Sequence, residues 1–308
     1  MIEIDYCFLK SKLCKEPSDY YVYHYTSPEG LEGIIRTNSL HFTNIYFLND
    51  NTEIIHTYKI LNDLLPSLKN EINEKLYIEI ENRVNEIINP NYLKNKTKII
   101  GDNDFYIASF STEKDNLALW NNYTKTESKV GYNIGFNLEK LKNSLKTRNL
   151  ANSNSPFLIP SMVNYNLNEQ KAELEKCIKK YNSLINNNNY FEVCRNLLYN
   201  LIVYSLFFKH KSFSIENEYR IVICNIGELE DNKLEFKIRN GLFIPYISCE
   251  LSGKTQVNER EIEKITCSPT INKEIAKYSL VKLFNKYGYS AMSDFINFSQ
   301  IIIRSIVL

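Results

Sequence analysis

Charged residues alternate with apolar ones between Ser212 and Ile223, SFSIENEYRIVI. If this stretch forms a β-strand, Glu216, Glu218 and Arg220 project from one face, because successive side chains of a strand point to opposite sides. A strand that only packs usually carries β-branched residues on one face and scattered polar residues on the other. Two carboxylates beside a guanidinium are therefore candidate reactive groups, since carboxylates accept protons, stabilise positive charge or bind divalent metal ions.

A second polar group lies near the start of the chain, in YVYHYTS from Tyr21 to Ser27. The aromatic and β-branched run predicts a strand from Tyr20 to Tyr25, and the polar residues His24, Tyr25 and Thr26 lie at its end. Ser27 is then a helix N-cap and the next residue, a proline, is the first helical position. A helix start offers free N–H groups to a ligand, so we predict that this strand and the acidic strand meet at one site.

Hydroxyl groups mark a third strand, FYIASFS, which ends at Ser111. Alternation places Ser109 and Ser111 on one face of it. Asp115 is then the predicted N-cap of a helix that carries Trp120 and Tyr123.

The remaining pattern predicts the scaffold. Seven to nine strands with helices between them indicate an α+β fold with a mixed sheet. No compelling linker is visible, so we predict a single domain over residues 1–308 with helical insertions at about 52–98 and 166–208. The helix predicted from Tyr190 to Phe208 is apolar nearly all round and is expected to be buried. Residues 300–308 are expected to form a terminal strand, whose edge could pair with another chain in a homo-oligomer.

Composition excludes few functions. The chain has 308 residues, of which 37 are basic and 36 acidic, so its net charge of +1 demands no polyanionic or membrane partner. Its seven cysteines form no metal-ligand spacing, which favours reduced thiols in a cytoplasmic protein. We expect no signal peptide and no membrane span.

The order of motifs resembles a bacterial family, the domain of unknown function 2971. The matching pieces, spread over most of the chain, are YHYTS, FLNDNTE, ASFSTEKDNLALWNNY, VGYNIGF, KHKSFSIENEYRIV, LFIPYI and ITCSPT. The family usually has proline where this chain has Asn51. The family name implies no chemistry.

A more distant resemblance does imply chemistry. The beginning of the chain is similar to the NAD-binding half of ADP-ribosyltransferases, in which a strand with His or Arg precedes a short helix. His24 matches that first motif, Ser109 and Ser111 match the second, and Glu216 and Glu218 match the Glu-x-Glu of the third. The resemblance implies a largely antiparallel sheet core, NAD as the substrate and no metal.

In this chemistry the bond between nicotinamide and ribose is cleaved through an oxocarbenium-like state, with the electronic demand of glycoside hydrolysis. The resemblance makes Glu218 the carboxylate that binds the ribose 2′-hydroxyl and faces the positive charge. Glu216 would orient or deprotonate the acceptor.

The resemblance also implies a set of NAD-binding residues: His24 and Thr26 for a ribose or the nicotinamide amide, Tyr25, Trp120 or Tyr123 for stacking on the nicotinamide, and Arg220 and Lys211 for the pyrophosphate. The acceptor is a macromolecule, either protein or nucleic acid, or water. A toxin or phage-defence setting is an association with the superfamily.

Other functions and purely structural roles are also compatible with these residues. Asp50, Glu53, Glu216 and Glu218 could form a carboxylate cluster for Mg²⁺ or Mn²⁺ in a nuclease or phosphohydrolase. A non-catalytic module that senses a nucleotide is a third possibility. The structural alternatives are a solvated strand face for the two glutamates, a core histidine at position 24 and core packing for Trp120.

Overall fold

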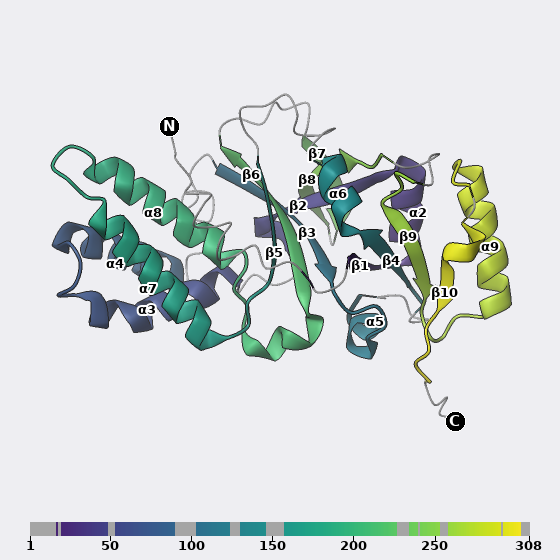
Figure 1. The fold of residues 1–308 in the computed structure, drawn as a ribbon, viewed down its shortest axis with the longest axis horizontal. Helices are drawn as coiled ribbons and strands as arrows, with labels where there is room; N and C mark the ends of the chain where they lie inside the picture. The colour runs from purple at the N-terminus through teal and green to yellow at the C-terminus, as the bar shows by residue number, and fades with distance from the viewer. Residues whose placement is uncertain are drawn as a thin grey trace.

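The computed structural model of the chain describes residue 17 and residues 20–48, 53–89, 103–123, 130–145, 157–226, 234–239, 241–252, 258–290 and 292–302. In these ranges a mixed, largely antiparallel β-sheet is flanked by helices (Figure 1), so the predicted α+β class is confirmed at this level. Asp50, Asn51 and most of the predicted terminal strand lie outside the described residues, as does the side chain of Glu53.

The strands that the structure describes form one sheet. Its main path has the order β10-β9-β4-β1-β3-β2-β8-β7, and β6 joins it through β3, with β5 beside β6. Among the described pairings, β9 with β10 is parallel and the others are antiparallel. The bounds are β1 Tyr21–Thr26, β2 Ser39–Asn44, β3 Asn103–Ser111, β4 Tyr132–Asn137, β5 Phe157–Met162, β6 Glu218–Ile226, β7 Leu234–Arg239, β8 Leu242–Glu250, β9 Ile262–Cys267 and β10 Ile296–Phe298.

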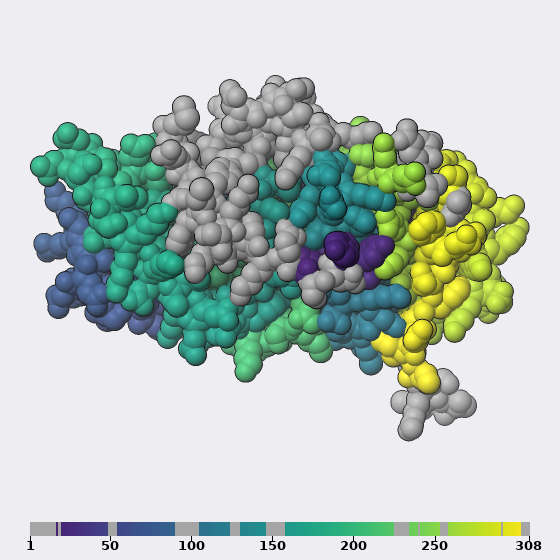
Figure 2. Space-filling view, viewed as in Figure 1, coloured from purple at the N-terminus to yellow at the C-terminus, as the bar shows by residue number. Residues whose placement is uncertain are grey.

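The helices differ in where they lie relative to the sheet. One group, α3, α4, α7 and α8, forms one end of the molecule, whereas α9 and β10 form the opposite end (Figures 1 and 2). The α8 helix is buried along most of its length, as its apolar sequence predicts. The bounds are α2 Pro28–Thr37, α3 Glu53–Leu68, α4 Glu74–Ile88, α5 Leu117–Tyr123, α6 Leu138–Ser144, α7 Leu167–Ser183, α8 Tyr190–Ser205 and α9 Lys273–Lys286.

Each face of the central strands has its own apolar core. On one face, Phe105 and Ile107 of β3 pack with Val222 of β6 against the α3, α4, α7 and α8 group. On the other face, the alternate residues of the same strands pack with side chains from α2, α6 and α9. The central pair β3 and β6 is therefore buried on both sides over much of its length, which fixes its register.

The two edges of β3 are paired differently. Along one edge β3 pairs with β6 over its whole length. Along the other edge β1 pairs with the end of β3, where Tyr23 lies opposite Ser111, and β2 pairs further back, where Thr43 lies opposite Ile107. The strands β1 and β2 thus diverge beside Ser109, and we call this place the split.

The acidic stretch is not one continuous strand. Lys211–Glu216 forms a 3₁₀-helix, and β6 begins only at Glu218. Asn217 between them is left-handed, with φ 39°. Asparagine tolerates this conformation better than most residues, and here its amide also donates to Glu113 at 2.7 Å. The prediction that Glu216 and Glu218 alternate along one strand is therefore wrong, because the chain turns between them.

Two expectations from composition, on membrane spans and on the cysteines, can be compared with the described residues. None of the described helices is long and apolar enough to cross a membrane. Within the described ranges the cysteines are buried free thiols, namely Cys177, Cys194, Cys224, Cys249 and Cys267.

The start of α2 packs closely on the end of β1, and Ser27 caps the helix as predicted. The Ser27 hydroxyl accepts from the Gly30 N–H at 3.2 Å. A Cβ added at Gly30 would lie 2.0 Å from Thr26 Oγ1 and 3.3 Å from Thr26 Cβ, whereas one added at Gly33 would meet nothing within 4 Å.

We therefore predict opposite effects for two glycine substitutions in α2. Gly30→Ala should lower the free energy of unfolding by about 1–3 kcal/mol because Thr26 must move. Gly33→Ala should raise it by about 0.5–1 kcal/mol, since alanine loses less backbone entropy in a helix. Urea denaturation of both variants measures this, and equal effects would contradict the packing at Thr26.

Candidate active site

The polar residues predicted from two strands share one face of the sheet. Cross-strand partners point to the same side, and Ser109 pairs with Arg220 while Ser111 pairs with Glu218. Ser161 of β5 lies on the other side of Arg220 in the same row. The N-terminal strand β1 lies along the opposite edge of β3, so β1 and β6 flank β3 and do not pair with each other. Tyr23 shares the face of Ser111, whereas His24 lies opposite Ile134 and packs on Phe110, on the other face of the sheet.

Four buried charges form the centre of the site, which we call the charge cluster: Lys209, Glu216, Glu218 and Arg220. The Lys209 ammonium lies 2.7 Å from Glu216 Oε2 and 3.2 Å from Glu218 Oε2. Arg220 holds Glu218 with two bonds, Nε to Oε1 at 2.8 Å and Nη2 to Oε2 at 2.9 Å. The turn at Asn217 thus brings both carboxylates to one ammonium.

The charge cluster is closed by bonds to the backbone. Arg220 Nη1 donates to the Leu206 carbonyl at 2.6 Å, just after α8. Residual exposure is 8% for Glu216, 5% for Glu218 and 2% for Arg220, so the alternative of a solvated strand face is wrong. Two positive and two negative groups balance, which is the arrangement that buried charges require.

The two carboxyl groups of the charge cluster have opposite pKa shifts. Burial alone would raise the pKa of the Glu218 carboxyl, but attraction by Arg220 and Lys209 and hydrogen bonds from Arg220 and Ser109 hold that pKa well below its usual range. Burial raises the pKa of the Glu216 carboxyl despite its bond to Lys209. Glu218 is therefore a fixed anion, whereas Glu216 takes up a proton more readily.

Two tyrosines border the charge cluster. The Tyr165 hydroxyl accepts from the backbone N–H of Glu218 at 3.1 Å, and burial together with the Glu218 charge raises its pKa. Burial and the charges of Glu216 and Glu218 raise the pKa of Tyr123. Both hydroxyls consequently stay protonated near neutral pH and can donate hydrogen bonds beside the carboxylates.

Ser109 connects the first predicted motif with the third. Its carbonyl lies 3.0 Å from His24 Nδ1, and its hydroxyl, on the same face as Arg220 and Glu218, helps to lower the pKa of the Glu218 carboxyl. Ser109 is partly exposed, whereas the residues from Phe105 to Phe110 around it are buried. The split therefore opens to solvent at the residue that touches both His24 and Glu218.

The protonation of His24 follows from this geometry. A carbonyl oxygen can only accept, so Nδ1 carries the proton in the bond to Ser109. Burial lowers the pKa of His24, partly opposed by the bond to Ser109, and the charge of Lys237 lowers it further. The ring is therefore neutral near pH 7, and its Nε2 is an acceptor.

Tyr25 and Trp120 are packed together next to the split. Their rings meet edge to face at 4.8 Å, and their exposed fractions are 7% and 2%. The Tyr25 hydroxyl donates to the Glu113 carbonyl at 2.8 Å, and Trp120 Nε1 donates to Asp115 Oδ1 at 2.7 Å. The structure therefore places Trp120 in a small core, as its structural alternative expects.

Asp115 does not cap α5 as predicted. The Asn116 side chain does so, accepting from Ala118 N at 2.9 Å. Asp115 instead accepts from the Ser299 hydroxyl at 2.7 Å and from the Gln300 N–H at 2.9 Å, which ties the end of the described chain to this region.

The remaining residues that were predicted to bind NAD lie in different surroundings. Ser111 is buried and donates to the Glu216 carbonyl at 2.7 Å, and Thr26 is partly exposed at the start of α2. Lys211 is exposed on the 3₁₀-helix, and the charge cluster uses Lys209 instead. Arg220 is committed to Glu218 and the Leu206 carbonyl.

Lys209 and Tyr165 are the site residues that sequence reasoning missed. Lys209 follows the buried α8, and its carbonyl accepts from Gln170 Nε2 at 3.0 Å, which fixes the chain where it leaves the helix. The sequence did contain one indication, because Lys209 directly follows a long apolar run. A charged side chain at such a position must be either solvated or paired.

The carboxylates in the described residues do not gather as a metal site would require. Over the described ranges there is no group of three or more His, Cys, Asp or Glu side chains arranged for a metal ion. Asp50 and the side chain of Glu53, which the metal alternative needs, lie outside those ranges.

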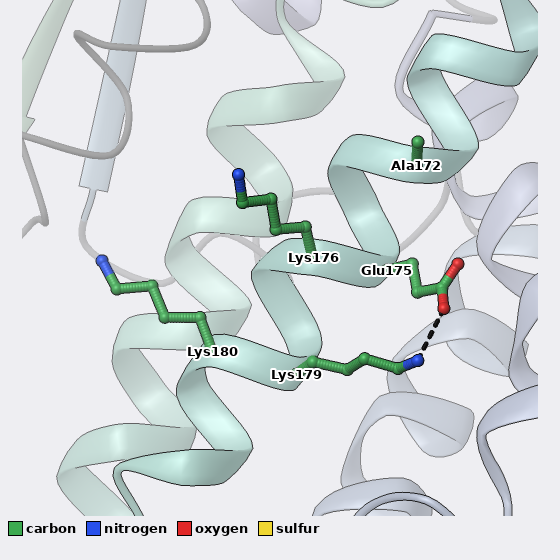
Figure 3. A pocket seen from close by; sticks show the side chains of 5 residues that line it. All are labelled: Ala172, Glu175, Lys176, Lys179 and Lys180. Atoms are coloured by element: carbon green, nitrogen blue, oxygen red, sulfur yellow. Dashed lines mark hydrogen bonds and ion pairs between the residues drawn. The ribbon is translucent and has the colours of Figure 1, made fainter.

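A surface hollow of about 490 Å³ lies elsewhere, along α7. Figure 3 shows that its lining side chains project from one helix and that Lys179 turns toward Glu175 at 2.7 Å. None of the predicted site residues lines it; the lining residues are Ala172, Glu175, Lys176, Lys179 and Lys180.

Comparison with known proteins finds a family match over part of the chain. A model of the family described as "Protein of unknown function (DUF2971)" matches residues 119–221. The predicted resemblance to this family is thereby confirmed over a range that contains the whole charge cluster. The description of the family names no activity.

One curated relative also matches. The chain is 28% identical over 174 residues to "Probable polyketide synthase 10" of Dictyostelium discoideum, which is 54% of this chain and 7% of that protein. The match thus covers a small fraction of the relative's length. No solved structure matches the chain significantly.

The opposite pKa shifts predict opposite effects on acid stability. The depressed pKa of Glu218 stabilises the fold above its ordinary value of 4.5, and this contribution is lost as the pH falls below that value. The raised pKa of Glu216 acts in the other sense, because its ionisation costs stability above its folded pKa and acid relieves that cost.

Urea denaturation from about pH 6 to about pH 3 tests these signs. Relative to the parent, Glu216→Gln should lose stability more steeply on acidification, and Glu218→Gln less steeply. Parallel profiles for the two variants would show that the carboxyl groups are not differentiated.

Proposed function

We propose that this protein binds NAD and cleaves its nicotinamide–ribose bond, transferring ADP-ribose to a macromolecule or to water. The observation that supports this most is the contact of Ser109 with both His24 and Glu218. Ser109 thereby links three motifs far apart in sequence, each matched to ADP-ribosyltransferases, because its backbone meets His24 and its side chain faces Glu218. The largely antiparallel sheet is also the core that this resemblance implies.

Glu218 is suited to stabilise the transition state. Bond cleavage develops positive charge on the anomeric carbon, so a carboxylate that is already ionised and already oriented stabilises that state more than the ground state. Two bonds from Arg220 fix its plane, and the hydroxyl of Ser109 holds it from the side of the split.

Glu216 has the properties of the group that moves a proton. Its pKa is raised, and it shares Lys209 with Glu218 at 2.7 and 3.2 Å respectively. An acceptor hydroxyl, amine or water near Tyr123 would give its proton to Glu216 as the new bond to ribose forms. In this proposal Glu218 is the stabilising anion and Glu216 is the base.

The neutral His24 is the proposed recognition residue. With Nδ1 donating to Ser109, its Nε2 can accept from a ribose hydroxyl or from the amide N–H of nicotinamide. Thr26 lies two residues further along β1, beside the free N–H groups at the start of α2.

A non-catalytic nucleotide-binding module is the second candidate. Its support is the mutual neutralisation of the charge cluster, in which both carboxylates are buried and bonded to cations. The metal-dependent alternative has less support, since the described residues hold no group of three or more His, Cys, Asp or Glu side chains arranged for a metal ion.

The test is to titrate the protein with NAD by calorimetry and to follow nicotinamide release with and without EDTA. We expect binding and EDTA-insensitive release, and we expect Glu218→Gln to lower release at least about a hundredfold because an amide keeps the shape but loses the charge. Binding without release, also in cell lysate as acceptor, would favour the non-catalytic module. Release that needs a metal ion would favour the nuclease or phosphohydrolase class.

Loss of activity must be separated from loss of folding. Glu218→Gln leaves the buried Arg220 and Lys209 with one carboxylate, which costs about 3–5 kcal/mol. The double variant Glu218→Gln with Lys209→Met removes one charge of each sign and should melt closer to the parent. Glu175→Gln, in a surface pair with Lys179, is the matched control, with an effect below about 1 kcal/mol. Full activity in the folded double variant would overturn the role of Glu218.

A further inference from the structure

A second charged group lies across the split from the charge cluster. The ammonium of Lys237 on β7 donates to Thr43 Oγ1 at 3.0 Å and lies 5.5 Å from the centre of the Tyr246 ring. It is only partly exposed, and among the described residues no carboxylate forms an ion pair with it. Glu235, two residues earlier on β7, accepts instead from the Tyr246 hydroxyl at 2.8 Å.

The strand register places Lys237 on the same face of the sheet as Glu218. Lys237 pairs with Ile244, two residues before Tyr246, and Tyr246 pairs with Thr43. Thr43 in turn pairs with Ile107, two residues before Ser109. Because cross-strand partners share a face and every second residue of a strand does too, the row continues from Lys237 to Ser109 and the charge cluster.

His24 lies near both groups but points toward the opposite face of the sheet, where its ring packs on Phe110. It contacts Ser109, and the charge of Lys237 is near enough to lower the pKa of its ring. His41, stacked on Tyr246 at 4.0 Å, experiences the same positive charge. Lys237 therefore places positive charge on the side of the split that β2, β7 and β8 line, and Glu235 offsets part of it at His41.

Other cations are less suited to bind an anion here. Arg220 is neutralised by Glu218, and Lys211 is exposed on the 3₁₀-helix beside the charge cluster. Arg239, the last residue of β7, adds its charge to that of Lys237 and donates to the Phe47 carbonyl. A half-buried ammonium beside a second cation is costly to maintain without an anion, so a bound anion is its natural partner.

We propose that Lys237, with the Thr43 hydroxyl, forms an anion site for a diphosphate group. On the proposed function, this group is the pyrophosphate of the dinucleotide, whose nicotinamide end reaches His24 and Glu218. The anion site itself depends only on the contacts of Lys237, so it is testable without NAD.

The experiment is calorimetric titration of the full chain with inorganic pyrophosphate at low ionic strength. We expect Lys237→Met, which keeps the chain length but removes the charge, to weaken binding at least about tenfold, and Lys237→Arg to retain it. Lys282→Met is the matched control, because Lys282 also lies over a tyrosine, at 5.6 Å from the Tyr278 ring centre, but on α9.

Thermal melting separates a binding role from a structural one. Without an anion, Lys237→Met should melt at the same temperature as the parent or higher, because it removes an uncompensated charge. Pyrophosphate should raise the melting temperature of the parent and of Lys237→Arg, but not of Lys237→Met.

The inference is overturned if the parent does not bind pyrophosphate or if Lys237→Met binds it as tightly. It is also overturned if Lys237→Met melts lower and Lys237→Arg does not restore binding, since the lysine would then be structural. Pyrophosphate binding that depends on Lys237, in a protein that neither binds nor cleaves NAD, would support the anion site while rejecting the proposed function.

Discussion

The bond between Glu218 and Arg220 is the interaction on which the arrangement of the site depends. Both groups are buried beside the core in which β3 and β6 pack against the helices, and each charge is tolerable only because the other is held in contact. Arg220 also binds the backbone just after α8, and Lys209 arrives from the same segment. Charge balance therefore fixes where the helical end of the molecule meets the sheet, and it does so at the carboxylates that are candidates for chemistry.

The second constraint is the unequal pairing of β3. A strand paired fully on both edges has no backbone group left for a side chain or a ligand, because its neighbours satisfy its N–H and C=O groups. Here β1 and β2 part beside Ser109, and the His24 side chain takes the place of a backbone partner. The same irregularity leaves Ser109 partly exposed within a buried strand. One departure from regular pairing thus creates the opening and positions His24 in it.

The sequence predicted the parts of the site that depend on local pattern. Strand alternation placed Ser109 and Ser111 on one face, and residue type predicted the cap at Ser27. The turn at Asn217 was missed because the alternating pattern suggested one continuous strand. Asn217 instead ends the 3₁₀-helix by donating to the Ser214 carbonyl, and its side chain bonds the distant Glu113. Asp115 and Asn116 are adjacent and equally good caps, so sequence could not decide between them.

Other features required tertiary structure. Lys209 is paired only because the end of α8 lies against the sheet, and no period in the sequence encodes that packing. Lys237 sits in an alternating edge strand, where a lysine ordinarily faces solvent. Its relation to the candidate site is visible only from the strand register, which places Lys237 on the same face of the sheet as Thr43 and Ser109.

The two sides of the split differ in how their charges are compensated, and this difference bears on the proposed ligand. On one side the anion Glu218 is fixed by cations, yet it can still attract a positive centre that forms in the split. On the other side Lys237 has a hydroxyl and a ring as neighbours, with no described carboxylate paired to it. An oxidised dinucleotide carries positive charge on its nicotinamide ring and negative charge on its diphosphate. In the proposed complex, the diphosphate therefore lies toward Lys237 and the nicotinamide toward Glu218. Because the charges of the charge cluster balance one another, the charge of Lys237 is what favours this orientation of the ligand.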